Sequence, residues 1–251
     1  MHKITALSFL LMAVYSLGAH AQTEDTPEVA PVEEESLIAG WSGEGQLGFT
    51  STSGNSDSES LNAKLGISKE KDKWKHGASI ESLKTTTDNI TSADSFIFKE
   101  KSEYKFGEKA YAFGKVRYED DKFSGYDYQT SIAFGGGYQV LESASQTLDV
   151  SAGIGYRKIK DTLTQQTKDG SILTADASYG YIISAYAKFS EVLSVEAGDD
   201  NTHSESETAL QTKINGNLAS KISYLIKHNS DVAVGIEKTD KILTVALVYS
   251  F

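Results

Sequence analysis

Apolar residues recur at every second position along most of the chain from about residue 40 to its C-terminus. Strict alternation of this kind is typical of β-strands, because successive side chains of a strand point to opposite faces. No convincing 3.6-residue period of an amphipathic helix accompanies it. The alternating segments number twelve, the first beginning at Trp41 and the last ending at Phe251. The sequence therefore predicts an all-β fold of about 12 strands.

The polar stretches between these strands fall into two classes by length. They are short after the even-numbered strands and mostly longer after the odd-numbered ones, as at 85–95, 159–172 and 199–207. Short turns on one rim and long loops on the other are typical of bacterial outer-membrane barrels. We therefore expect a single antiparallel, transmembrane, up-and-down β-barrel. Glu100 interrupts the apolar face of its strand, and we expect there either a β-bulge or a strand register other than the one assigned.

Alternation alone does not separate a membrane barrel from a soluble β-sandwich or a lipocalin-like barrel. The predicted strands have about the 9–11 residues that a tilted membrane strand requires. Aromatic residues gather near the strand ends, as in the girdles at membrane interfaces, whereas small or aliphatic residues occupy the middles. These features favour an outer-membrane location, with membrane lipid around the barrel.

The N-terminal 38 residues lack this alternation. Residues 1–21 combine Lys3, an apolar stretch and a small-x-small triplet at 19–21, which predicts a cleavable secretory signal peptide. Residues 22–38 hold both prolines of the chain and six acidic residues without any Lys or Arg, which predicts a disordered acidic linker. The barrel domain is then expected at 39–251, where no proline would delete a backbone donor from the sheet.

The composition excludes several classes of function. The chain has no cysteine, so neither disulfides nor thiol chemistry are available. Its net charge of −11 argues against a nucleic-acid partner.

The polar faces of the predicted strands carry charges of both signs, and in a barrel these faces turn toward the lumen. Opposite charges there can pair and hold the barrel's shape, or they can line a narrow path for solutes. The predicted lumen-lining residues are Lys64, Glu81, Lys99, Lys101, Glu103, Lys105, Arg117, Glu119, Asp149 and Arg157.

The sequence predicts no catalytic, cofactor or metal site. None of His76, His203 and His228 has a motif spacing to a Ser, Asp or Glu that would assemble a catalytic triad, so we expect no enzyme and no cofactor. The acidic stretches 119–121 and 199–207 could offer oxygen ligands to a divalent cation, but they match no calcium loop. We expect them to be solvated surface segments.

The C-terminal strand carries a candidate assembly signal. Leu247, Tyr249 and Phe251 lie on one face of this strand, and Phe251 is the last residue. Recognition by β-augmentation uses main-chain hydrogen bonds for affinity and alternate side chains for specificity. We therefore expect the barrel-assembly machinery of the outer membrane to bind this strand.

Four stretches of the chain form recognisable motifs: WSGEGQLG at 41–48 with SGNS at 53–56, GKVRYEDDKFSGYDYQ at 114–129, FGGGY at 134–138 and AGIGY at 152–156. These motifs resemble the YdiY-like family of salt-induced outer-membrane proteins. The resemblance covers residues 40–251. It implies an outer-membrane barrel, and it carries over no catalytic residue because the family is a domain of unknown function.

Two functions remain open at this stage. The first is an integral outer-membrane barrel of envelope or osmotic (salt) stress function, which could act as a narrow small-solute or ion channel. The second is a structural or adhesive surface barrel that acts through its extracellular loops. About 8 strands leave an interior filled by side chains and about 16 leave a channel, so a count of twelve decides neither case. No pattern in the sequence identifies a transported solute or an oligomeric state.

Overall fold

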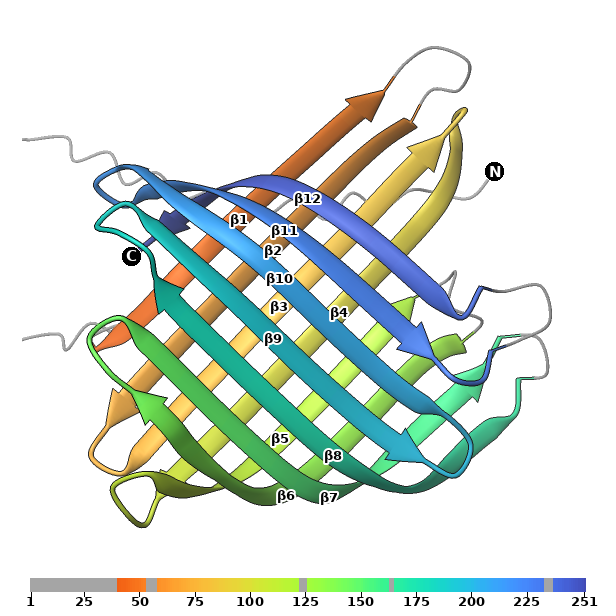
Figure 1. Ribbon diagram of the computed structural model, residues 1–251. Helices are drawn as coiled ribbons and strands as arrows, with labels where there is room; N and C mark the ends of the chain where they lie inside the picture. Colours follow the sequence, from red (N-terminus) through yellow and green to blue (C-terminus); the bar gives the residue numbers. More distant parts are fainter. Residues whose placement is uncertain (1–39, 53–57, 122–125, 163–164, 233–236) are drawn as a thin grey trace, which may run out of the picture. The chain divides into compact units, whose positions relative to one another are not determined.

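Twelve antiparallel strands follow one another around a closed barrel, in which the last strand pairs with the first. The computed structural model describes residues 40–52, 58–121, 126–162, 165–232 and 237–251, so the predicted signal peptide and linker lie outside it. In Figure 1 the strands of the near wall cross those of the far wall obliquely, as the tilt of a closed sheet requires. The predicted all-β, 12-stranded, up-and-down barrel is confirmed.

The strand bounds are β1 Trp41–Thr52, β2 Ser58–Lys71, β3 Trp74–Thr87, β4 Ile90–Lys105, β5 Ala110–Asp121, β6 Tyr126–Glu142, β7 Gln146–Asp161, β8 Thr167–Ile182, β9 Ala187–Gly198, β10 Thr202–Asn215, β11 Leu218–Asn229 and β12 Thr239–Ser250. Within the described part of the chain, no helix is long and apolar enough to cross a membrane.

The strands are longer, and several connections shorter, than the sequence predicted. Strand lengths run from 12 residues in β1 to 17 in β6, so the expected length of 9–11 is wrong. The connections predicted at 85–95, 159–172 and 199–207 shrink to 88–89, 162–166 and 199–201. Between β3 and β4, Asp88 and Asn89 adopt φ values of 50° and 62°, the left-handed conformation of a two-residue hairpin turn. Polar residues that resembled loops therefore belong to strands that continue past the apolar band.

The two rims of the barrel still differ in their connections. One rim, which we call the turn rim, carries the connections 72–73, 106–109, 143–145, 183–186 and 216–217 together with Phe251. The other, the loop rim, carries 53–57, 88–89, 122–125, 162–166, 199–201 and 230–238.

The outward face of the barrel is apolar and the inward face is mostly polar. Leu47, Ile154 and Leu243 alternate with inward residues and are 58%, 69% and 64% exposed. The β-bulge expected at Glu100 is wrong, because the β3–β4 register runs unshifted from Trp74 opposite Tyr104 to Thr85, and β4–β5 is also unshifted. Glu100 therefore keeps its place on the outward face.

Two aromatic side chains enter the lumen from β5 and need glycines opposite them. Tyr111 and Phe113 are buried on the inward face. A Cβ atom at Gly137 would lie 2.1 Å from Cζ of Tyr111, and one at Gly135 would lie 2.8 Å from Cε1 of Phe113. These glycines let the rings lie against the backbone of β6.

The seam between β1 and β12 is the shortest pairing of the barrel. It joins five residue pairs, from Glu44 with Ser250 to Gly48 with Ala246, whereas β1 pairs with β2 over its whole length. Phe251 extends the seam by two backbone hydrogen bonds with Gly43, of 2.8 and 2.9 Å. Toward the loop rim the two strands diverge (Figure 1).

Candidate functional site in the barrel lumen

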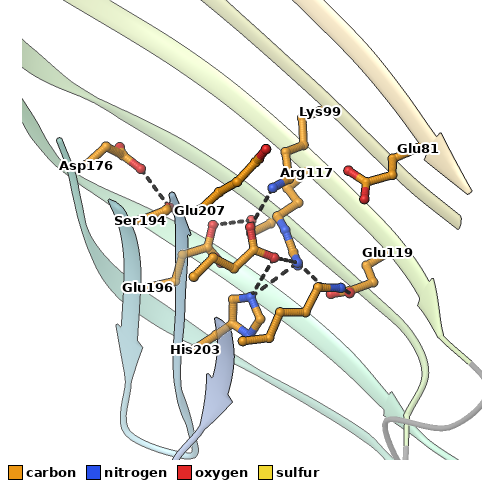
Figure 2. Close-up of polar contacts among 12 residues, drawn as sticks. Glu81, Lys99, Arg117, Glu119, Asp176, Ser194, Glu196, His203 and Glu207 are labelled. Atoms are coloured by element: carbon orange, nitrogen blue, oxygen red, sulfur yellow. Dashed lines mark hydrogen bonds and ion pairs between the residues drawn. The ribbon is translucent and has the colours of Figure 1, made fainter. Parts of the chain in front are cut away.

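Six charged or titratable side chains from four strands meet inside the barrel, and we call them the central network: Lys99, Arg117, Glu119, His203, Glu205 and Lys227. Figure 2 shows Arg117 and His203 pointing toward each other in the middle of the lumen, with Lys99 and Glu119 beside them. The alternation of the strands turns each of these side chains inward.

Arg117 is the centre of the network. Its Nη2 atom donates to Oε1 of Glu205 at 2.9 Å and lies 2.6 Å from Oε2 of Glu119. The same nitrogen is 3.2 Å from Nε2 of His203. The carboxylates have further cations: Lys99 Nζ is 2.6 Å from Glu205, and Lys227 Nζ is 3.0 Å from Glu119. Each carboxylate in this group therefore accepts from at least two cationic side chains.

The central network joins opposite walls of the barrel. Lys99, Arg117 and Glu119 lie on β4 and β5, whereas the other three members lie on β10 and β11. In the strand order of the closed sheet these pairs of strands are far apart. Contacts of about 3 Å between them therefore cross the lumen and narrow it.

A second group of ion pairs lies beside the central network. Lys64 of β2 is 3.6 Å from Glu81 of β3 and 3.5 Å from Glu207 of β10. Lys221 of β11 lies 2.7 Å from Glu207. This group again links β2 and β3 to β10 across the lumen.

A further ion pair links β5 to β8 inside the barrel. Lys115 Nζ lies 2.9 Å from Asp176, which also accepts from Ser194 Oγ at 2.7 Å (Figure 2). Arg157, only 1% exposed, holds the β9–β10 connection, since its Nη2 donates to Asp200 at 3.0 Å and to the carbonyl of Asn201. Ion pairs thus brace the lumen in several directions.

Two separate cavities lie along the lumen and share one lining residue, Lys227 of the central network. The larger, of about 870 Å³, is lined by residues near the turn rim such as Ser42 and Ser250, and also by Arg117 and Lys227. The smaller, of about 360 Å³, is lined by residues nearer the loop rim such as Ser92, and again by Lys227. Lys227 therefore stands between the two cavities.

Two aromatic rings lie beside Lys101, which lines the larger cavity. Lys101 Nζ lies 5.1 and 5.0 Å from the ring centroids of Tyr111 and Phe113, within cation–π range. Its ammonium also pairs with Glu103 at 2.9 Å. The Tyr111 hydroxyl donates to Asp149 at 2.5 Å, which fixes the ring in the lumen.

The ten residues predicted to line the lumen fall into several groups. Arg117 and Glu119 contact each other in the central network, and Lys99 joins them through Glu205. The remaining members are distributed as follows: Lys64 with Glu81; Lys101 with Glu103 and, through Tyr111, with Asp149; Arg157 at the β9–β10 connection; and Lys105 with Glu70 at the turn rim.

Sequence reasoning missed His203, Glu205, Glu207 and Lys227. The stretch 199–207 was expected to be a solvated acidic segment, which is wrong for 202–207, because β10 begins at Thr202 and turns its acids inward. Here the strand alternates charged residues with Ser and Thr instead of with apolar residues. The signal available in the sequence was that charged or titratable residues occupy every second position of this stretch, although the positions between them are not apolar.

The described residues contain no group of three or more His, Asp or Glu side chains arranged to hold a metal ion. His76 lies outside the lumen, on the outward face of β3, where its Nδ1 is 2.8 Å from Ser102 Oγ. Ser102 Oγ in turn donates to Glu100. The serine thus lies between the carboxylate and the imidazole, whereas a catalytic triad has the histidine in the middle.

The residues of the candidate assembly signal lie along the seam. Leu247 pairs with Leu47 and Tyr249 with Gly45, and both side chains are about half exposed on the outward face. The ring of Phe251 covers Gly43, where an added Cβ would lie 2.2 Å from it.

Comparisons with known proteins agree with this architecture. The chain is 27% identical over 217 residues to the uncharacterized protein YdiY of Escherichia coli (strain K12), a match that covers 82% of each chain. The COG4313 outer membrane channel from Pseudomonas putida F1 has a TM-score of 0.52 at 12% identity, covering 89% of this chain and 100% of that one. The translocator domain of the autotransporter NalP from Neisseria meningitidis gives a TM-score of 0.48 at 13% identity, covering 84% and 88%. The likeness to the channel shows a shared barrel fold.

The family model described as protein of unknown function, DUF481, matches residues 45–251, which include eleven complete strands and most of β1. The resemblance to the YdiY-like family is therefore confirmed. With this match extending from the first strand to the last residue, the chain belongs to the DUF481 family.

Proposed function

We propose that this protein is an integral outer-membrane barrel of the bacterial envelope that acts as a narrow channel for ions or small solutes, with the central network as its constriction. The observation that carries the proposal is the pair of cavities, of about 870 and 360 Å³, that approach each other at Lys227. Polar, paired charges line the route, while the outward face is apolar, as a wet lumen in a lipid bilayer requires. Because the short turns of outer-membrane barrels face the periplasm, we place the turn rim on the periplasmic side.

The alternative of a surface barrel that acts through its loops has less support. Among the connections of the loop rim that the structure describes in full, 88–89 and 199–201 have two and three residues, which leaves little area for a binding surface. The family resemblance extends the proposal to osmotic stress. A deletion strain should then recover more slowly than its complemented parent after a sudden rise in NaCl, and equal recovery would remove this part of the proposal.

Conductance in planar bilayers tests the channel. The purified protein should give reproducible unitary currents, and the paired change Glu119→Gln with Lys227→Met should raise the unitary conductance, because it removes an ion pair across the lumen without leaving an unpaired charge of that pair. A matched control is Asp127→Asn with Lys160→Met, an ion pair of 3.0 Å that lies at the loop rim, outside the network.

The control pair should leave the conductance at its wild-type value. Absence of unitary currents in both the wild type and the Glu119–Lys227 variant, over a range of salt and voltage, would refute the channel. An equal rise in the control variant would show that the central network is not the constriction.

A further inference from the structure

Two clusters of polar side chains interrupt the apolar outward face of the barrel. The first, which we call the β3–β4 patch, consists of His76, Glu100 and Ser102. Ser102 Oγ donates to Glu100 Oε1 at 2.5 Å and is 2.8 Å from Nδ1 of His76. The His76 ring stacks on Trp74 with centroids 5.6 Å apart, which fixes its orientation. In the described structure the Nε2 atom of His76 has no hydrogen-bond partner.

The second cluster, the β9–β10 patch, consists of Glu191, Ser206 and Thr208. Ser206 Oγ donates to one carboxylate oxygen of Glu191 at 2.8 Å, and Thr208 Oγ1 donates to the other. Thr208 is the register partner of Glu191, so the three side chains share the outward face of two neighbouring strands.

The carboxylates of both patches lie between aromatic or aliphatic residues of their own strands. Along β4, Glu100 has Phe96 and Phe98 toward the loop rim and Tyr104 toward the turn rim. Along β9, Glu191 lies between Phe189 and Leu193. An ionisable group that faces hydrocarbon costs free energy. The internal hydrogen bonds offset only part of that cost, which favours a protein partner for each patch.

The two patches lie on opposite walls, each next to an aromatic residue near the turn rim. In the closed strand order, four strands separate β4 from β9 on one side and four separate β10 from β3 on the other. His76 is one outward position above Trp74, and Glu191 is one outward position above Phe189, counted from the turn rim. Copies inserted with the same orientation therefore bring one patch against the other when they meet side by side.

We propose that the β3–β4 patch of one copy binds the β9–β10 patch of the next, so that barrels associate head to tail in the plane of the membrane. His76, as an imidazolium, then donates from Nδ1 to Ser102 and from Nε2 to Glu191 of the neighbouring copy, which is a charge-assisted pairing with the carboxylate. Because the patches are on opposite walls, the contact is heterologous and produces rows instead of closed two-fold dimers. The proposal rests on the membrane location given under the proposed function.

Disulfide cross-linking in membranes tests this contact, and the absence of native cysteine leaves no background. Ala78 and Leu193 are the next outward positions above His76 and Glu191. Two differently tagged copies, one with Ala78→Cys and one with Leu193→Cys, should form a mixed disulfide dimer on oxidation. The single-cysteine copies alone should not. Ile154→Cys with Val245→Cys, on two other walls, is the matched control and should not cross-link.

Adding Glu191→Leu to the Leu193→Cys copy should abolish the mixed dimer. Mixed dimers that persist unchanged in this background would overturn the proposal, as would cross-linking only between identical cysteines or at the control positions. Fractionation and unheated electrophoresis of the same samples distinguish a failure of the association between copies from a failure of the proposed membrane location. Barrels found in the outer membrane without a mixed dimer overturn the association alone, whereas a soluble product refutes the membrane location itself.

Discussion

Arg117 is the residue on which the buried charges of the lumen depend most. Replacing it by Met leaves Glu119 and Glu205 buried with one cation fewer, and removal of one partner from a buried ion pair costs about 3–5 kcal/mol. Lys99 and Lys227 remain near these carboxylates, so the loss should lie toward the lower end. Urea unfolding of the refolded barrel in detergent would measure it.

The matched control is Lys75→Met. Lys75 pairs with Glu103 at 3.7 Å, and its side chain is 48% exposed, so its loss should cost no more than about 1 kcal/mol. Equal losses for the two variants would mean that burial of the central network does not decide its contribution to stability.

Gly137 gives a second test at this scale, because the Tyr111 ring occupies the place of its side chain. Gly137→Ala should destabilise the barrel by about 1–3 kcal/mol through overpacking. Gly170→Ala, at a position with open space around its Cβ, is the control and should have little effect of this kind. Adding Tyr111→Ala to Gly137→Ala should give a cost below the sum of the single costs, since the clash is then gone.

Single residues also mark where sequence reasoning succeeded and where it failed. Arg117 and Glu119 alternate with Tyr118 and Val116, so the ordinary contrast of polar and apolar positions found them. Glu205 alternates with Ser204 and Ser206, and that stretch resembled a loop. The contact between Arg117 and Glu205 could not be predicted at all, because it joins residues 88 positions apart through the closure of the barrel.

Among the strands, β12 carries a prediction about assembly. Deleting Phe251 removes the terminal aromatic residue and two backbone hydrogen bonds to Gly43, so we expect slower membrane insertion and degradation in the periplasm, with export unchanged. Pulse-chase labelling with fractionation would measure this. Deleting 23–36, in the predicted linker, should leave insertion at the wild-type rate.

Gly43→Ala separates recognition of Phe251 from its role in the closed barrel. The added methyl group displaces the Phe251 ring in the folded protein but leaves the C-terminal sequence intact. If Phe251 acts as an assembly signal, this variant should insert at the normal rate and unfold more readily. Wild-type insertion after deletion of Phe251, or equally slow insertion of Gly43→Ala, would show that Phe251 is not that signal.

Element boundaries were the least predictable feature at this scale. The number and order of strands followed from alternation, whereas their ends did not, because strands that extend past the apolar band carry polar residues on both faces. The stretch TTTDNITSAD at 85–94 resembled a loop, yet only Asp88 and Asn89 are outside β3 and β4. The left-handed φ values of these two residues suit the Asp and Asn side chains.

For the molecule as a whole, the proposed membrane location predicts resistance to detergent. A closed ladder leaves few backbone groups unpaired, and exposing such groups to an apolar environment costs several kcal/mol each. Outer-membrane samples should therefore migrate differently in electrophoresis before and after boiling. Recovery of a soluble, monodisperse β-protein without detergent would refute the location.

The sequence predicted the fold class of the whole barrel but not the state of its lumen. Alternation identifies the inward side chains, and both signs of charge were evident. Whether those charges meet across the barrel depends on which walls face each other and at what height. That information lies in the tilt and register of all twelve strands, and no local pattern contains it.

The five-pair seam between β1 and β12 has a consequence for the order in which the barrel forms and comes apart. It joins the two ends of the sheet, so it is the contact with the greatest separation in sequence and the one with the largest loop-closure entropy. In β12 on the loop-rim side of Ala246 and in β1 beyond Gly48, the backbone amides that point away from β11 and β2 should exchange with deuterium first. The pairing of β1 with β12 should then form last in folding and break first in unfolding. The closed barrel therefore has one strand pairing that is weaker than the others.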